Sequence, residues 1–415
     1  MKPTKSLFLT LALLAMGASA NATTETIYIT GSTAFRAATI EGIRTVLGGG
    51  TASSAPAPTA QSNATLDSAN AINWIGVTYN SHTVNIKVSF YGSVGGVQSV
   101  DQGIKWPFFA DSVTGTNTTT FVPPVYSNTN PNSSIYTDFQ VPTAALSDTY
   151  QSTTPYNATS LNDTPVGIVP FQWVASYGAP TGLSLNNHLV NSIFSGGSAS
   201  LATATGNYSA DHGTFLFAAG RDADSGTRAV ALAEAGYGAS TPVAQYTPVT
   251  SGTAVTGHAY SAAATINNTL HGVGDGGFNS GGNLAKALRY STSAIGGYYV
   301  TYLGKSDAST ALTSAGAGNG AGNAVPVAWN GASYFSSGSF TDAAITSGQY
   351  TFWSTEHILT QTLGGSTQAA VFIPALATAI AGTSAGTGTV SYSGINLLAM
   401  TVSRTGDGGY VLQNY

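Results

Sequence analysis

The chain repeats one local pattern: an apolar stretch of strand character, a turn rich in Gly, Ser or Thr, and then a helical pattern. The first instance runs from the strand-like Glu25–Thr30 through a Gly-Ser-Thr turn into a helical pattern over 34–47. A second strand-like stretch ends at Tyr91 before a Gly-Ser turn, and a third, Thr214–Gly220, leads into 221–228 and an Ala-rich helix. Strands that alternate with helices in this way favour an α/β class with a largely parallel sheet.

Charge is sparse. Charged residues make up 7% of the 415, and the formal net charge is −5. Ordinary globular domains carry about 25% charged residues. Because the chain has only 12 Lys and Arg, we expect no nucleic-acid partner and no attraction to an anionic membrane surface. The 42% of apolar residues suffices for a sizeable core, and the absence of Cys excludes disulfides, thiolate metal sites and Cys nucleophiles.

The N-terminus has the features of a cleavable secretory signal. Lys2 and Lys5 precede the apolar run Leu7–Met16, and small residues suitable for cleavage lie around Ala20 and Ala22. This run is shorter than the roughly 20 residues of a membrane span. We therefore expect residues 1–22 to be a signal peptide and the mature protein to be periplasmic or secreted, without stable membrane insertion and without a lipid-bearing Cys.

Three of the turns place small hydroxyl residues at the start of a helix: Gly31–Thr33, Gly92–Gly96 and Asp224–Thr227. The free N–H groups of a helix N-terminus carry roughly half a positive charge and attract anions. Ordinary N-capping explains each turn taken alone, because Ser, Thr and Asp are preferred caps. An anion site therefore requires that the three turns converge.

Arg221 lies at the end of a strand that we expect to be buried. It does not lie on the solvated face of a helix. Its guanidinium can chelate a tetrahedral oxyanion, or pair with Asp222 or Asp224 in its own loop, and the two are compatible. Arg36, near the first turn, is either a second anion contact or a surface charge, and we favour the surface charge.

The segment Arg221-x-x-x-Ser225-Gly226-Thr227 resembles the anion-binding motif of periplasmic phosphate-binding proteins, the receptors of the phosphate ABC importer. One departure is Ala223, where the family often has an acid two positions after the Arg. Further short matches follow in the family's order, and they are Gly31–Phe35, Tyr91–Val97, Asp111 after Phe108-Phe109-Ala110, Ala294–Tyr299 and Gly348–Tyr350.

This resemblance implies a two-lobed type II periplasmic-binding-protein fold, in which each lobe is a mixed, largely parallel sheet flanked by helices and the ligand cleft lies between the lobes. Lobe 1 would comprise 23–164, with polar insertions at 48–70 and 112–164, together with 325–415, and lobe 2 would comprise 165–324. Since the chain would cross between the lobes twice, we expect hinge closure around a ligand.

The resemblance also implies a phosphate site formed by Thr33, Ala34, Ser93, Asp111, Arg221, Ser225, Gly226 and Thr227. Backbone N–H groups, hydroxyls and one guanidinium would hold the anion. The Asp111 carboxylate can only accept hydrogen bonds, so it would favour an anion that keeps a proton. Phosphate keeps one near neutral pH and sulfate does not, whereas arsenate would satisfy the same groups.

The expected function is non-catalytic capture of inorganic phosphate by an exported solute-binding protein, for delivery to an ABC permease. The main alternative is a secreted or cell-surface structural or adhesive protein that keeps the fold without phosphate transport, which the Gly, Ser, Thr and Asn content favours. A phosphoester hydrolase is disfavoured because the sequence has no hydrolase nucleophile motif and no metal-ligand spacing among its six His. We expect no catalytic residue, cofactor or metal, with Asp275 as a turn residue and Glu356-His357 near the start of a C-terminal helix.

Overall fold

The computed structural model describes residues 24–117, 135–313, 320–382 and 394–414. The expected signal peptide, and 118–134 within the expected insertion at 112–164, lie outside these residues. Within the described chain, no helix has the length and apolar character needed to cross a membrane.

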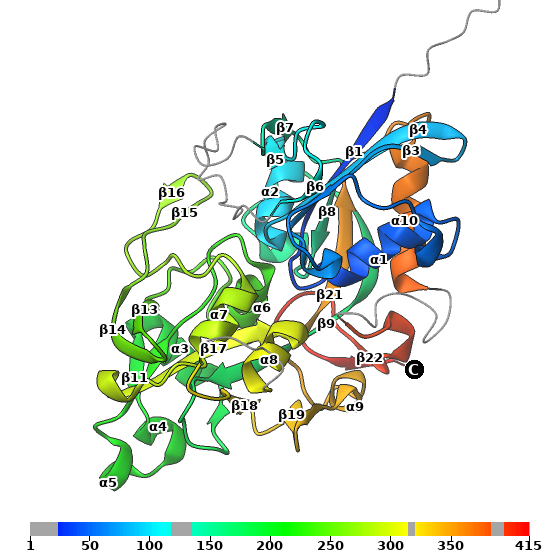
Figure 1. Ribbon diagram of the computed structural model, residues 1–415. Coiled ribbons are helices and arrows are strands. Elements are labelled where there is room, and N and C mark those ends of the chain that lie inside the picture. The colour runs from blue at the N-terminus through cyan, green and yellow to red at the C-terminus, as the bar shows by residue number, and fades with distance from the viewer. Residues whose placement is uncertain (1–23, 118–134, 314–319, 383–393, 415) are drawn as a thin grey trace, which may run out of the picture.

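One mixed sheet of 13 strands runs through the molecule (Figure 1). Its centre is β9 (Asn162–Ala175), whose 14 residues are enough for different neighbours along its length. The first part of β9 pairs with β21 (Trp353–Thr360), and the last part pairs with β17 (Gly297–Gly304) and β18 (Val325–Trp329). The sheet therefore has two halves that share one strand.

The first half contains three parallel strands. β1 (Glu25–Gly31) lies between β4 (His82–Phe90) and β8 (Ala144–Ser147) and runs parallel to both. β21 is antiparallel to β8, and β3 (Ala71–Tyr79) is antiparallel to β4. The carboxyl ends of β1, β4 and β8 therefore lie at the same edge of the sheet, which is where the first two turns begin.

The second half is built around β17. β12 (Phe215–Ala218) runs parallel to β17 and carries β11 (Ser198–Ser200) at its edge. On the other side of β9, β18 pairs with β10 (Ser184–Leu185). The third turn, at 221–228, leaves the carboxyl end of β12.

Helices cover both halves of the sheet (Figure 1). In the first half, α1 (Arg36–Leu47) packs on α10 (Ala369–Ala381), and α2 (Ser93–Gln102) packs on β1 and β8. A Cβ added at Gly42 of α1 would lie 2.7 Å from Ile380 of α10, so only Gly allows this close approach. The helices of the second half include α3 (Asn187–Gly196), α6 (Gly226–Glu234), α7 (Gly281–Ala287) and α8 (Lys305–Leu312).

Most of the remaining elements are short and lie outside the central strands of the main sheet. The helices among them are η1 (Ala52–Ser54), η2 (Leu66–Ser68), η3 (Gln151–Thr153), α4 (Ala202–Thr205), α5 (Tyr208–Asp211), η4 (Ser293–Ile295), α9 (Asp342–Thr346) and η6 (Leu397–Ala399). The strands are β2 (Ala60–Gln61), β5 (Trp106–Phe108), β6 (Gly115–Thr116), β7 (Asp138–Gln140), β13 (Tyr246–Ser251), β14 (Ala254–Tyr260), β15 (Thr265–Ile266), β16 (Thr269–Leu270), β19 (Phe335–Ser336), β20 (Ser339–Phe340), β22 (Val402–Ser403) and β23 (Leu412–Gln413).

An aromatic cluster lies beside β9 in the centre of the molecule. Trp173 stacks on Trp329 and on Phe352, with ring centroids 5.5 and 5.1 Å apart. Tyr302 meets Trp173 edge to face at 5.7 Å. All four side chains are almost completely buried. Because β9 and its aromatic neighbours belong to both halves of the sheet, the halves share one hydrophobic core.

The α/β class expected from the sequence is confirmed by this sheet and its helices. The expectation for Glu356 and His357 is wrong, because both lie in β21 and not near the start of a helix. Every residue of β21 is buried, since the strand lies between β8 and β9. A strand buried on both faces shows no alternation of polar and apolar residues, so the pattern gave no strand signal.

Candidate functional site

The first turn joins β1 to α1 and borders open space. Ser32 is fully buried, and its Oγ accepts a hydrogen bond from the Phe35 N–H at 3.2 Å. Thr33 and Ala34 line a cavity of about 140 Å³, together with Arg36 and Asp307 from α8. The Ser32 hydroxyl therefore holds the turn that precedes α1, whose N-cap is Phe35, whereas Thr33 and Ala34 border a space that a ligand could enter.

Arg36 is not the surface charge that the sequence favoured. Its Nε donates to the Asp67 carbonyl at 3.2 Å, and its Nη1 donates to Asn70 Oδ1. It is half-buried and also lines a larger cavity, of about 380 Å³, that opens between α1 and α7. These bonds tie the guanidinium to the turn at 66–70 and leave it facing the cavity.

The second turn begins α2 and is joined to the third. The N–H groups of Val94 and Gly95 donate to the Asp224 carbonyl at 3.0 and 3.3 Å. Gly92 has φ of +149°, and a Cβ there would lie 2.3 Å from that carbonyl oxygen. Only Gly fits this contact, which packs the two halves of the sheet directly against each other.

The third turn begins α6. Ser225 is its N-cap, with Oγ accepting from the Arg228 N–H at 3.3 Å. Gly226 and Thr227 form the first turn of the helix, and both are buried. The Thr227 hydroxyl does not cap its own helix but donates to the Asp148 carboxylate at 3.1 Å.

Asp148 is the point at which the second and third turns converge. Its Oδ1 accepts a hydrogen bond from Ser93 Oγ and its Oδ2 accepts one from Thr227 Oγ1, while its own N–H donates to Ser93 Oγ at 3.1 Å. A Cβ added at Gly226 would lie 1.8 Å from Oδ1. The side chain is buried, which raises the pKa of this carboxyl, while the two hydroxyls and the Arg221 charge oppose the rise. One carboxylate thus lies among donors from both halves.

Asp111, which the sequence assigned to this position, lies elsewhere. Its side chain is 64% exposed, and its Oδ1 pairs with Lys87 Nζ at 2.5 Å. It follows β5, which pairs only with β7 and does not join the main sheet. The structure does not bring Asp111 to Ser93 and Thr227, because the acid that follows the strand paired with β1 is Asp148, after β8, and not Asp111, after β5.

The sequence did carry a signal for Asp148. The stretch Ala144-Ala145-Leu146-Ser147 is short and apolar, and Asp148 follows it directly, as Asp111 follows Phe108-Phe109-Ala110. Both fit an acid at the end of a strand. Because 112–164 is dominated by Thr, Ser, Asn and Pro, the four-residue strand β8 was included in a polar insertion.

Arg221 is buried beside this site. Its Nε donates to the Phe278 carbonyl at 3.0 Å and its Nη2 to the Asn279 carbonyl at 3.2 Å. Asp222, one of the two acids of the same loop, accepts a hydrogen bond from the Tyr91 hydroxyl at 3.0 Å. The Arg221 charge nevertheless opposes the rise that burial causes in the pKa of Asp148, Asp222 and Asp307.

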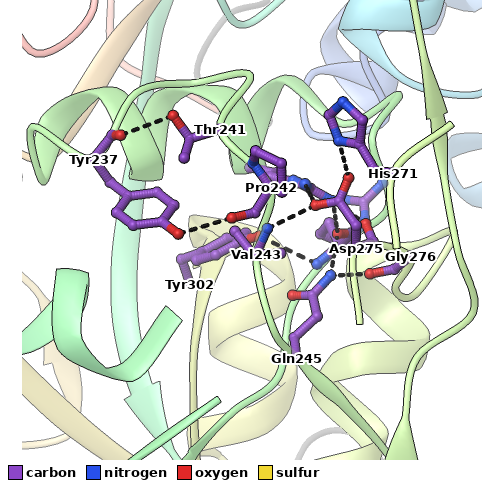
Figure 2. Close-up of polar contacts among 11 residues, drawn as sticks. Tyr237, Thr241, Pro242, Val243, Gln245, His271, Asp275, Gly276 and Tyr302 are labelled. Carbon is purple, nitrogen blue, oxygen red and sulfur yellow. Dashed lines mark hydrogen bonds and ion pairs between the residues drawn. The ribbon is translucent and has the colours of Figure 1, made fainter. Parts of the chain in front are cut away.

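A buried ion pair between Arg228 and Asp275 belongs to a polar network, and Figure 2 shows Asp275 of this network between His271 and Val243. Asp275 Oδ1 accepts from Arg228 Nη2 at 2.5 Å and from the Val243 N–H at 2.8 Å, and its Oδ2 contacts His271 Nδ1 at 2.6 Å. Gln245 donates to the carbonyls of Arg221 and Gly276. Asp275 is therefore a structural ion-pair residue. Among the described residues, no group of three or more His, Asp or Glu could hold a metal ion.

Glu356 of β21 is a second buried carboxyl near Asp148, and it takes no part in the hydrogen bonds described for Asp148. It is 0% exposed, and neither carboxyl oxygen has a hydrogen-bond partner in the described chain. Burial, together with the Asp148 charge, raises the pKa of this carboxyl well above its usual range.

The structure therefore brings most of the expected residues together, but not all. Ser93, Gly226 and Thr227 surround Asp148, and Ser225 caps the same helix. Arg221 is close enough to act on the Asp148 charge. Thr33 and Ala34 line the adjoining cavity, and Asp111 is elsewhere. Helix N-termini, hydroxyls and one buried guanidinium around an acceptor form an arrangement that can hold a small oxyanion carrying a proton.

The fold is a mixed α/β fold with one large mixed sheet. Comparisons with solved structures find similarities at low sequence identity. An ABC-type phosphate transport receptor from Vibrio cholerae is 13% identical, with 89% of this chain and 99% of that chain covered and a TM-score of 0.47. A phosphate-binding protein from Stenotrophomonas maltophilia is 13% identical over 76% of this chain and 85% of that chain, with a TM-score of 0.41. At these identities and scores the likeness concerns the fold alone.

No protein-family model and no curated protein matches this sequence.

Proposed function

We propose that this protein is an exported, non-catalytic binding protein that captures inorganic phosphate between the two halves of its sheet. One observation carries the proposal: hydroxyls from two helix N-termini, Ser93 of α2 and Thr227 of α6, converge on the buried carboxylate of Asp148 beside a buried Arg221. Donors alone would accept any oxyanion. A carboxylate among them favours an anion that can donate a proton back.

Discrimination follows from the chemistry of Asp148. An ionised carboxylate has no donor, so a fully deprotonated anion such as sulfate would place two acceptors against each other. Leaving a buried polar group unpaired costs about 1 to 3 kcal/mol, and more for charged groups. Phosphate near neutral pH has a proton to donate. We propose Asp148 as the selecting residue, in the role that the resemblance gave to Asp111.

The remaining contacts follow the expected set. We propose that the anion is held by backbone N–H groups of Thr33, Ala34 and Gly226, by the hydroxyls of Ser93, Ser225 and Thr227, and by the Arg221 guanidinium. In the structure Asp148 itself accepts hydrogen bonds from Ser93 and Thr227. Phosphate would therefore enter by separating α2 from α6 and would take over these two hydroxyls.

This opening requires two lobes that hinge. We propose that 23–164 with 325–415 forms one lobe and 165–324 the other, with β9 as one connection between them. The cavities lined by Thr33, Arg36 and Asp307 lie between residues of the two proposed lobes and are a natural route of entry. A periplasmic or secreted location, and delivery to an ABC permease, are part of the same proposal.

A second candidate is favoured by one specific observation. Asp148 already satisfies the hydroxyls of Ser93 and Thr227, and the Asp224 carbonyl satisfies two N–H groups of α2. A protein whose anion site is filled by its own carboxylate could keep the fold as a secreted or cell-surface structural protein that binds no phosphate. The two candidates differ in whether Asp148 can be displaced.

Calorimetric titration separates the two candidates. The mature protein is unfolded and refolded first, so that no anion is carried through purification, and is then titrated with phosphate. We expect saturable binding that Arg221→Met abolishes, while Arg44→Met, which removes a cation of the α1 surface, leaves binding unchanged. Absence of binding in correctly folded protein would favour the structural candidate.

A further inference from the structure

Glu356 is a buried carboxyl whose place in the site is set by strand pairing. β21 is antiparallel to β8, with His357 opposite Ser147. Glu356 is the next residue of β21 beyond this pair, and Asp148 directly follows the end of β8. The Asp148 charge acts directly on Glu356. The sheet therefore places a second carboxyl beside the one that faces the anion site.

Among the described residues, no cation forms an ion pair with Glu356. Across β9 it faces Gly167, and the Ser32 hydroxyl of the first turn opposes the rise in the pKa of its carboxyl. Its neighbour His357 pairs with Asp163 at 2.7 Å, and the ring of Tyr150 packs on that imidazole. The charged groups near β21 on the C-terminal segment are engaged elsewhere: Asp407 bonds Thr149, Tyr150 and Ser354, and Arg404 pairs with Glu234.

A carboxyl that is buried without a nearby cation is most stable in its protonated form. An ionised carboxylate without donors in a dry interior is far more costly than a neutral carboxylic acid. Burial and the neighbouring Asp148 charge both raise the pKa of Glu356, with only Ser32 opposing. Asp148 differs in having two hydroxyl donors and the Arg221 charge to support its ionised form. Burial therefore favours the neutral form of Glu356 more strongly than that of Asp148, whose ionised form is supported by two hydroxyls and a cation.

We propose that Glu356 is the positioning residue that keeps the anion site from accumulating negative charge, and that phosphate binding is lost as Glu356 gives up its proton. This inference rests on the proposed function. With Glu356 neutral, the charge of Arg221 offsets that of Asp148 and the site accepts an anion. With Glu356 ionised, a second negative charge lies behind Asp148 and repels the ligand. At pH values where Glu356 is partly ionised before phosphate binds, Glu356 therefore takes up a proton when phosphate binds.

The test compares the native protein with Glu356→Gln, which keeps the shape and stays neutral at every pH. The phosphate affinity of both is measured by calorimetry across the pH range in which they remain folded. Since the protonation of phosphate itself is the same for both proteins, it cancels in the comparison. We expect similar affinities at acid pH and native affinity about tenfold weaker than that of the variant at the alkaline end. The control is Asp163→Asn, which removes a carboxylate paired with His357, and it should follow the native curve.

Proton counting supplies a second readout. Titration in buffers of different ionisation enthalpy should show proton uptake in the native protein that Glu356→Gln reduces. Coinciding pH profiles and equal proton uptake, with phosphate bound by both, would overturn the role of Glu356 and leave the proposed function intact. No phosphate binding by the native protein at any pH would overturn the proposed function, and this inference with it.

If the Gln variant does not fold, infrared difference spectra of the native protein answer the question. A protonated carboxyl band at neutral pH that shifts when phosphate is added supports the proposal, and the absence of such a band overturns it.

Discussion

At the scale of single residues, Asp111 and Asp138 both pair with Lys87, and substitutions here test whether Asp111 lies outside the anion site. Lys87 is 1% exposed and pairs with both Asp111 and Asp138, and it also donates to the Phe109 carbonyl at 2.9 Å. We expect Asp111→Asn to cost no more than about 1 kcal/mol, because Asp111 is an exposed partner. Lys87→Met should cost about 3 to 5 kcal/mol, since it leaves Asp138 without its cation.

Urea unfolding measures both costs, and phosphate titration of Asp111→Asn measures its effect on binding. Unchanged phosphate selectivity is expected. A loss of selectivity in Asp111→Asn would return Asp111 to the site and contradict the geometry described above.

The pKa of Glu356 also makes a stability prediction that is independent of any ligand. Its folded-state pKa is raised well above the ordinary value of 4.5, so the folded protein binds a proton more tightly than the unfolded chain does. Stability from this group is fully present below pH 4.5 and falls as pH rises toward the folded pKa. We expect Glu356→Gln to gain stability relative to the native protein as pH rises, as measured by urea unfolding at several pH values. A difference that stays constant with pH would contradict a raised pKa.

At the scale of elements, the contact between α6 and the end of β8 leaves no room for a side chain at Gly226. A Cβ there would lie 1.8 Å from Asp148 Oδ1 and 2.7 Å from the Ser93 Cβ. We expect Gly226→Ala to separate α6 from Asp148, to lower the free energy of unfolding by about 1 to 3 kcal/mol and to abolish anion binding.

The matched control is Gly196→Ala in α3, where a Cβ would meet nothing within 4 Å. It should be neutral in thermal unfolding and in anion titration. If both glycine variants behaved alike, the close approach of α6 to Asp148 would be wrong.

How much of the architecture the sequence predicts also depends on the element. The three turns rich in Gly, Ser or Thr are predictable because each follows a strand pattern and carries a turn signal, and the first and third also precede a helix pattern. β8 is missed because four residues are too few for periodicity. β21 is missed because its polar residues are buried between two other strands. In both strands the tertiary neighbours, not the local pattern, determine the structure, and Asp148 and Glu356 lie at the end of one and within the other.

At the scale of the whole molecule, the C-terminal segment ties the halves of the sheet together. Asp407 accepts from Thr149 Oγ1 at 2.6 Å and from the Tyr150 N–H at 2.9 Å, directly after Asp148. Arg404 pairs with Glu234, at the end of α6, at 2.9 Å. The segment therefore contacts the chain beside both ends of the candidate site.

We expect Asp407→Asn to lower the free energy of unfolding by about 1 to 3 kcal/mol, because hydrogen bonds to a charged acceptor are lost. Hydrogen exchange should speed up over residues 145–150 before it does so elsewhere. Asp211→Asn, in α5, serves as the control, and exchange that rises equally in both variants would contradict a specific role for the C-terminal segment.

The central claim is that Asp148 selects a protonated oxyanion, and paired calorimetric titrations of phosphate and sulfate into refolded protein test it most directly. The account predicts that the native protein binds phosphate and rejects sulfate. It predicts that Asp148→Asn, whose amide can donate as well as accept, narrows this preference by about tenfold or more. Equal binding of the two anions by the native protein, or a preference that Asp148→Asn leaves unchanged, would contradict it.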